Sequence, residues 1–202
     1  MKVLAMAVLV LALSGTAVRA ADPRYPNWPC TQAKVPEISL AAVWAGPALD
    51  DAETKWKDDA KITALVAKLS ARKTPIDEAE KSVKDFLAAS PTDKTTNAKL
   101  LFAGLFDTLN AQRSQVMNGL ERVSRKQRDA ADKIRDETLA LQALQGATPR
   151  DEAKVEALSN ELIWKTRIFE DRHKVVRFVC EVPTSIDQRL FALGRVIQQE
   201  ME

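Results

Sequence analysis

Glycine, cysteine and histidine are scarce in this 202-residue chain, which contains six glycines, two cysteines and one histidine. The sequence has no glycine-rich phosphate-binding loop, no zinc-ligand spacing and no calcium-binding loop. Neither cysteine belongs to a CxxC motif, which argues against a thioredoxin-like redox site, and the absence of CxxCH excludes a c-type haem. The sequence therefore predicts neither a metal nor a cofactor.

The single histidine, His173, follows Glu170 with the Glu-x-x-His spacing that di-iron helical bundles use. Those sites need two such pairs and two further glutamates, which a chain with one histidine cannot supply. Nothing nearby in the sequence orients His173 toward a serine or cysteine nucleophile. We therefore expect a solvated surface histidine, and a protein that is not an enzyme.

Net charge is also nearly absent once the N-terminus is set apart. Residues 1–20 combine Lys2, an apolar run over 3–13 and small residues before a cleavage site after Ala20, which is typical of a secretory signal peptide. An uncleaved anchor or a buried helix is the alternative. Cleavage removes Lys2 and Arg19 from the 30 basic residues and leaves 28 against 28 acidic ones. A neutral mature chain gives no global electrostatic reason to bind nucleic acid or a membrane.

No later segment approaches the roughly 18 apolar residues that a membrane-spanning helix needs. We therefore expect an exported protein whose mature chain has no transmembrane segment, with the periplasm as first expectation and the extracellular space as second. Two cysteines in an exported chain of this size form a natural pair. The sequence predicts a disulfide between Cys30 and Cys180, with two free thiols or an intermolecular bridge as alternatives.

Proline is concentrated in residues 21–48, which hold five of the nine prolines. We expect this arm to be irregular or extended, apart from one short helical turn. Trp28 and Trp44 on the arm either cap the folded domain or present a binding surface, whereas Trp56 and Trp164 are expected in the core.

Residues 49–202 show no sustained period-two alternation, so we expect one all-α bundle domain without a sheet. Ser/Thr-Pro-x-Asp sequences beginning at Thr74, Ser90 and Thr148 mark helix starts. A hydroxyl caps the first N–H groups, proline fits the first helical position, and the acid faces the positive end of the helix dipole. The predicted helices are about 51–70, 75–88, 91–145, 149–181 and 185–201.

Apolar residues of the third predicted helix recur with alternating spacings of four and three from Phe102 to Leu144. This mean period of about 3.5 is typical of a coiled-coil seam. The fourth helix carries a matching seam from Val155 to Val179, and the short turn between the two makes them antiparallel neighbours. We predict a long antiparallel coiled-coil-like helical hairpin with three shorter helices packed on its open half.

Polar residues interrupt both seams, and three interpretations are open. Their stems cover the core while their heads reach water, or they fix the register, or part of the seam is left open for another protein's helix. Homodimerisation through the coiled-coil seam is a further expectation. The five positions are Arg113, Gln127, Glu137, Lys165 and Arg172.

The densest basic run places Arg122, Arg125 and Arg128, together with Lys126, on one helix. The three arginines fall on the arc that faces away from the seam. This group is either a solvated face or a docking patch for an anionic partner, phosphate polymer or lipid headgroup. No aromatic residue lies within it, which argues against single-stranded nucleic acid.

An elongated coiled coil with an imperfect seam and no catalytic constellation favours one function class. We expect an exported, non-catalytic helical protein that acts through protein–protein contacts, as an adaptor, assembly factor or chaperone-like scaffold of the cell envelope. Its partner would be another envelope protein, and no nucleic acid. The alternative is a binder of an anionic ligand or membrane surface through the basic face Arg122–Arg128.

Overall fold

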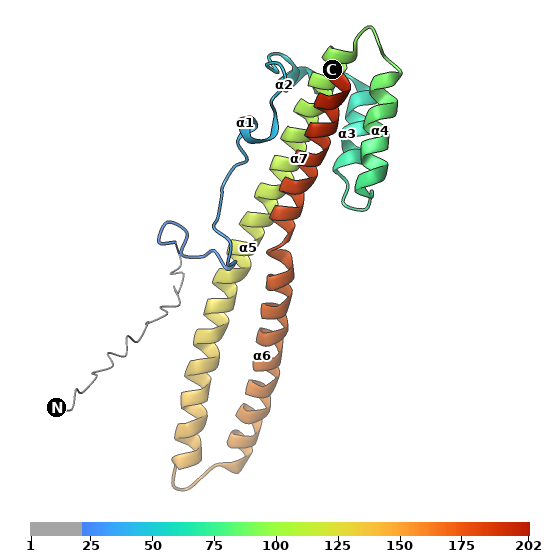
Figure 1. The fold of residues 1–202 in the computed structure, drawn as a ribbon. Coiled ribbons are helices and arrows are strands. Elements are labelled where there is room, and N and C mark those ends of the chain that lie inside the picture. The colour runs from blue at the N-terminus through green and yellow to red at the C-terminus, as the bar shows by residue number, and fades with distance from the viewer. Residues whose placement is uncertain (1–21) are drawn as a thin grey trace, which may run out of the picture.

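The computed structural model describes residues 22–202 (Figure 1), so the expected signal peptide at residues 1–20 lies outside the described residues. Every regular element of this part of the chain is a helix, and it contains no strand. The two longest stretches of helix pack against each other and against shorter helices. The predicted all-α helical hairpin is confirmed.

The hairpin is built on α5 (Lys94–Gly146), a single helix of 53 residues. α6 (Glu152–Val179) returns antiparallel to it, and α7 (Val182–Met201) continues nearly end to end with α6 along the first part of α5 (Figure 1). Both α6 and α7 pack against α5. The second arm of the hairpin is therefore two helices with one break.

Pro183 explains the break between α6 and α7. It sits in the first turn of α7 and has no N–H, so the carbonyl of Val179, four residues earlier, has no helical donor. Cys180 (φ −59°, ψ −24°) and Glu181 (φ −80°, ψ −16°) keep right-handed helical angles. The chain therefore bends without turning back, and α7 continues along α5.

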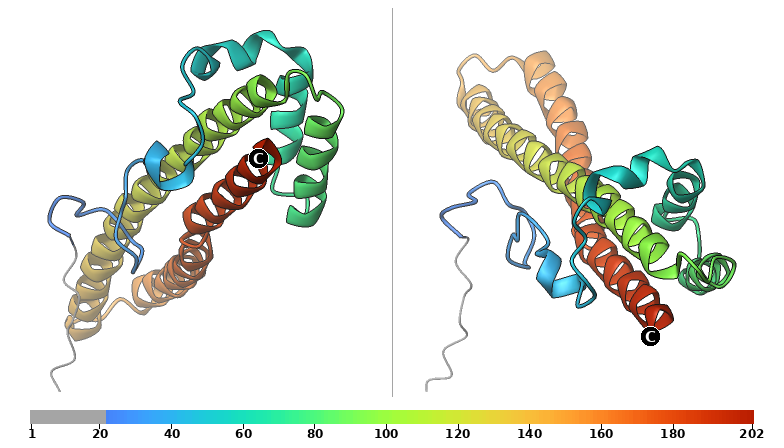
Figure 2. Two further views of the ribbon diagram at one scale, coloured as in Figure 1. Left: turned by 45° about the horizontal axis from the view of Figure 1, so that its top comes forward. Right: turned by 90° about the horizontal axis from the view of Figure 1, so that it is seen from above.

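Short helical segments cover the first part of α5: α1 (Leu40–Val43), α2 (Ala52–Lys55), the 3-10 helix η1 (Trp56–Asp58), α3 (Ala60–Ser70) and α4 (Ile76–Ala88). α3 packs mainly on α5 and α4 mainly on α7, at one end of the hairpin (Figure 2). We call these segments, α7 and residues 94–113 the head. We call α6 and residues 114–146 the stalk.

The prediction of one continuous helix over 51–70 is wrong, because Asp59 divides it. Asp59 has extended backbone angles (φ −98°, ψ 111°), and its carboxylate accepts the backbone N–H groups of Lys61 at 2.8 Å and Ile62 at 3.1 Å. This is an N-cap, and it starts α3 in the middle of the predicted helix. The residues before it form α2 and η1, which carry Trp56 into the core at 7% exposure.

The Ser/Thr-Pro-x-Asp motifs mark the starts of α4, α5 and α6 to within three residues. The hydroxyls of their Ser and Thr residues, however, do not cap these helices. Thr74 donates its hydroxyl backward to the carbonyl of Lys68 at 2.9 Å, at the end of α3. α5 begins after Asp93, and α6 begins after Asp151, whose carboxylate accepts the N–H of Lys154 at 3.1 Å. In these two motifs the helix starts immediately after the aspartate and not at the proline.

The head has a core of fully buried side chains from α3, α4, α5 and α7. Phe102 is completely buried, and the ring of Trp44 stacks on it with the centroids 4.2 Å apart. Trp44 is 7% exposed and donates its Nε1 to the carbonyl of Pro47 at 2.7 Å. Trp44 was expected either to cap the folded domain or to present a binding surface. The structure shows that it caps the core.

Gly194 permits the close contact of three elements in that core. A Cβ atom there would lie 2.8 Å from the Phe102 ring and 2.9 Å from the carbonyl oxygen of Val43. Both distances are below ordinary van der Waals contact. Only a residue without a side chain lets α7 approach α5 and α1 this closely.

Candidate interaction surface

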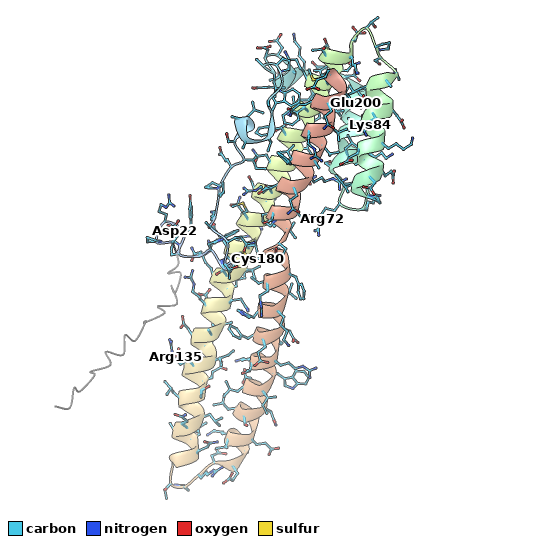
Figure 3. All side chains as sticks on the ribbon, in the orientation of Figure 1. Asp22, Arg72, Lys84, Arg135, Cys180 and Glu200 are labelled. Carbon is cyan, nitrogen blue, oxygen red and sulfur yellow. A yellow bond between two sulfur atoms is a disulfide. The ribbon has the colours of Figure 1, made fainter. Side chains whose placement is uncertain are left out.

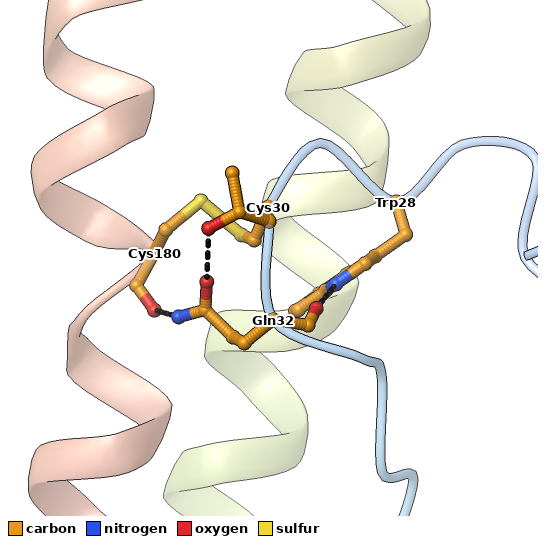
Figure 4. The surroundings of a disulfide bond; sticks show 5 residues. Trp28, Cys30, Gln32 and Cys180 are labelled. Atoms are coloured by element: carbon orange, nitrogen blue, oxygen red, sulfur yellow. Dashed lines mark hydrogen bonds between the residues drawn. A yellow bond between two sulfur atoms is a disulfide. The ribbon is translucent and has the colours of Figure 1, made fainter. Parts of the chain in front are cut away.

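A disulfide fastens the N-terminal arm to the break between α6 and α7 (Figure 4). Cys30 and Cys180, 150 residues apart in sequence, are bonded, with Cα atoms 5.6 Å apart. Gln32 donates its Nε2 to the Cys180 carbonyl at 2.6 Å, and Trp28 donates its Nε1 to the Gln32 carbonyl at 2.7 Å. The structure thus brings together the predicted cysteine pair, and Trp28 packs beside it in a half-buried position.

Ion pairs and hydrogen bonds hold the rest of the arm on α5. Lys34 pairs with Glu121 at 2.7 Å, with both side chains largely buried, and its ammonium lies 4.6 Å from the ring centroid of Tyr25. Arg128 donates to the carbonyl of Pro26 at 3.0 Å. One member of the predicted basic patch therefore already has a partner within the chain.

Arg113 is buried in the head at 4% exposure. Its guanidinium donates to the carbonyl of Val35 at 2.6 Å, and its Nε lies 2.7 Å from the carboxylate of Asp187 on α7. Burial raises the pKa of Asp187, and the charge of Arg113 opposes that rise. Arg113 links the arm, α5 and α7, so the interpretation that its head reaches water is wrong.

Three other polar seam residues make bonds across the stalk. Gln127 donates to the carbonyl of Phe169 at 3.1 Å. Lys165 pairs with Glu137 across the hairpin and with Glu161 on its own helix, and these carboxylates raise the pKa of Lys165, Glu137 having the larger effect. Contacts that join fixed positions of two helices favour the interpretation that these residues set the register.

The predicted basic patch surrounds a depression of about 510 Å³ on α5. Arg122, Arg125 and Lys126 form no ion pair with any residue that the structure describes, whereas Arg135 farther along α5 pairs with Asp132 at 2.9 Å. The depression is lined by Asn27, Arg122, Arg125, Lys126, Arg128 and Asp129. The structure therefore gathers the four predicted residues around one hollow, with a single carboxylate among them.

A groove of about 630 Å³ runs between α5 and α6, and we call it the α5–α6 groove. Its charged lining residues are all basic: Arg122, Lys126 and Arg172. Val123 and Val175 remain 39% and 59% exposed, so the groove is open to solvent. Its apolar lining comprises Val116, Leu120, Val123, Val175, Val176 and Val179.

Four large apolar side chains are exposed on one face of α6. Trp164, Ile168, Val175 and Phe178 are 63%, 48%, 59% and 78% exposed. Their spacings of four, seven and three residues follow the 3.5-residue period, so they lie along one line on the helix. We call these four residues the α6 stripe. Val175 belongs both to the stripe and to the α5–α6 groove.

The prediction that Trp164 lies in the core is wrong. The seam of α6 passes through Leu162, which is 8% exposed, and Lys165, and this leaves Trp164 on the solvent side. The four stripe residues form a second apolar series with heptad spacing on α6. This series is present in the sequence and could have revealed the stripe. The groove has no such sequence signal, because it depends on how two helices are spaced.

Within residues 22–202, no group of three or more histidine, cysteine, aspartate or glutamate side chains is placed to hold a metal ion. No helix of that range has the length and apolarity to cross a membrane. His173 is exposed on α6. Comparison of the chain with protein-family models, with curated proteins and with solved structures finds no match.

Proposed function

We propose that this is an exported, non-catalytic helical protein that acts through protein–protein contacts of its stalk, as an adaptor, assembly factor or chaperone-like scaffold of the cell envelope. The observation that carries the proposal is the α6 stripe. Large apolar side chains gathered on an exposed face mark interaction sites. Tryptophan and other aromatic side chains contribute strongly to interface energies.

The division of the molecule supports the same proposal. The head buries most of its apolar residues in a core, whereas the stalk extends away from it as two helices (Figure 1). An extended pair of helices offers a long surface to a partner without disturbing the head. The signal-peptide pattern and the Cys30–Cys180 pair favour a periplasmic location, because disulfides persist in oxidising compartments.

Site-specific photo-crosslinking tests the proposal. p-Benzoylphenylalanine is placed at position 164 or 178 of the stripe, or at position 72 as a control, and the protein is irradiated in the cells that natively produce it. Arg72 is exposed in the turn between α3 and α4, in the head (Figure 3). We expect one discrete adduct from both stripe positions and none from position 72. Equal yields from all three positions, or none from the stripe, would refute the proposed contact surface.

A second candidate function is binding of an anionic ligand or membrane surface through the basic face Arg122–Arg128. The depression on α5, with three basic side chains unpaired among the described residues, favours it. Sedimentation with phosphatidylglycerol vesicles measures it directly. Reversal of Arg122, Arg125 and Lys126 to glutamate should abolish salt-sensitive binding, and binding that is unchanged by this reversal eliminates the candidate.

A further inference from the structure

We infer that the α5–α6 groove binds an amphipathic helix whose apolar stripe is flanked by acidic side chains. This inference rests on the proposed function, since it names the kind of partner that the stalk would take. Helix-in-groove recognition needs an apolar floor to receive the partner's stripe and polar rims to orient it. The groove has six apolar lining residues and basic side chains on both of its helices.

The basic side chains on the two rims of the groove indicate that its partner is acidic. Arg122 and Lys126 lie four residues apart on α5, and Arg172 faces them from α6. None of the three forms an ion pair with a described residue, although Lys165 and Lys174 on α6 do. Acidic residues on both flanks of a docked helix would pair with both rims, as flanking charges do in coiled coils.

Gly119 provides independent support. It lies inside α5, where glycine costs about 1 kcal/mol relative to alanine. A Cβ atom there would meet no neighbour closer than the Arg122 guanidinium at 4.0 Å, whereas those at Gly104 and Gly194 would collide with core atoms. Packing within the chain therefore does not require this glycine. Its missing side chain widens the groove that it lines.

The dimensions favour a helix over a single-chain lipid. The groove extends from Val116 to Gln127 on α5, which is about 16 Å or three helical turns. It is open to solvent at Val123 and Val175, and it meets the α6 stripe at Val175. A lipid tail would remain exposed there, whereas a helix would cover the groove and the adjoining stripe together.

Fluorescence anisotropy with two labelled peptides of about 14 residues tests the inference. Both peptides carry the same leucine stripe, flanked by glutamates in one and by lysines in the other. We expect the purified protein to bind the glutamate peptide at low salt, and to bind the lysine peptide at least about tenfold more weakly. Equal binding of both peptides, or no binding of the glutamate peptide, overturns the inference.

Gly119→Phe fills the groove, and Gly146→Phe adds the same side chain at the end of α5, where a Cβ atom meets nothing within 4 Å. We expect Gly119→Phe to weaken glutamate-peptide binding about tenfold or more, and Gly146→Phe to leave it within about twofold. Unchanged circular dichroism and melting temperature establish that both variants fold. Equal binding by the two variants overturns the inference.

Reversing the charge of single basic residues tests which of them contact the peptide. Arg122→Glu, Lys126→Glu and Arg172→Glu should each weaken glutamate-peptide binding several-fold, whereas Arg125→Glu, which lies outside the groove, should not. Vesicle binding that Gly119→Phe abolishes, without any peptide binding, would assign the groove to a lipid and overturn the inference. A protein that binds no peptide, but whose stripe positions still form crosslinks in the Gly119→Phe variant, would overturn this inference. The proposed function would then stand.

Discussion

The head and the stalk share the helix α5, but they differ in how completely they cover their apolar residues. In the head, Phe102, Leu105 and Leu190 are fully buried, because short helices and α7 surround this part of α5. In the stalk α6 is the only helix that packs on α5, with the N-terminal arm crossing its first part, and Phe178 is 78% exposed. Two helices enclose a narrow seam and no more. The number of covering helices, and not the residue type, therefore decides which apolar side chains are buried.

This difference predicts that substitutions in the head and in the α6 stripe affect different properties of the protein. Most apolar residues of the head pack against one another, although Phe191 of α7 is 52% exposed, so substitutions of the buried ones should change the free energy of unfolding. Those of the α6 stripe have no cover within the described chain, so substitutions there should change binding and leave stability nearly unaltered.

The largest loss of stability is expected at the boundary between the head and the stalk, where the disulfide lies. Cys30→Ser opens a loop of 150 residues, and the chain-entropy model gives about 5 kcal/mol for its closure. We expect a large decrease in melting temperature under oxidising conditions, measured by circular dichroism. Reducing agent should lower the melting temperature of the unsubstituted protein similarly and leave Cys30→Ser unchanged. Two free thiols in the exported protein, found by non-reducing mass spectrometry, would contradict this account.

A matched pair of phenylalanines tests the comparison itself. Phe102→Ala removes a fully buried ring from the head and should cost about 3–5 kcal/mol of unfolding free energy. Phe178→Ala removes an exposed ring from the stalk and should cost about 0.5 kcal/mol or less. Urea denaturation measures both. Similar losses for the two variants would show that the stalk surface is covered, contrary to the comparison.

Modest changes in stability, of opposite sign, are expected at two helical glycines. Gly194→Ala places a methyl group 2.9 Å from the Val43 carbonyl oxygen, and overpacking of this kind costs about 1–3 kcal/mol. Gly119→Ala meets only the Arg122 guanidinium, at an ordinary contact distance of 4.0 Å, and should stabilise the protein by about 0.5–1 kcal/mol through helix propensity. The two changes in melting temperature should therefore have opposite signs. A loss at both positions would mean that the stalk is packed as tightly as the head.

Patterns that are local along the chain predicted much of this fold. The 3.5-residue period of α5 and α6 identified the hairpin, and proline clustering identified the arm. The site was less accessible to such reasoning. The basic residues Arg122 and Lys126 were evident in the sequence, but their place on the rim of an apolar groove was not, because that depends on the spacing of two helices. Trp164 was misplaced because two heptad series overlap on one helix, and only one can face α5.

The sequence by itself determined the all-α class and the antiparallel hairpin, since these follow from periodicity and turn length, and it made Cys30–Cys180 the first of three possibilities for the cysteines. The tertiary structure alone decided that α7 extends α6, that Arg113 is buried against Asp187, and that the stalk keeps an open groove and an exposed stripe. The physical reason is that burial depends on how many elements surround a position. A pattern along one helix indicates which of its faces is apolar, but not what covers that face.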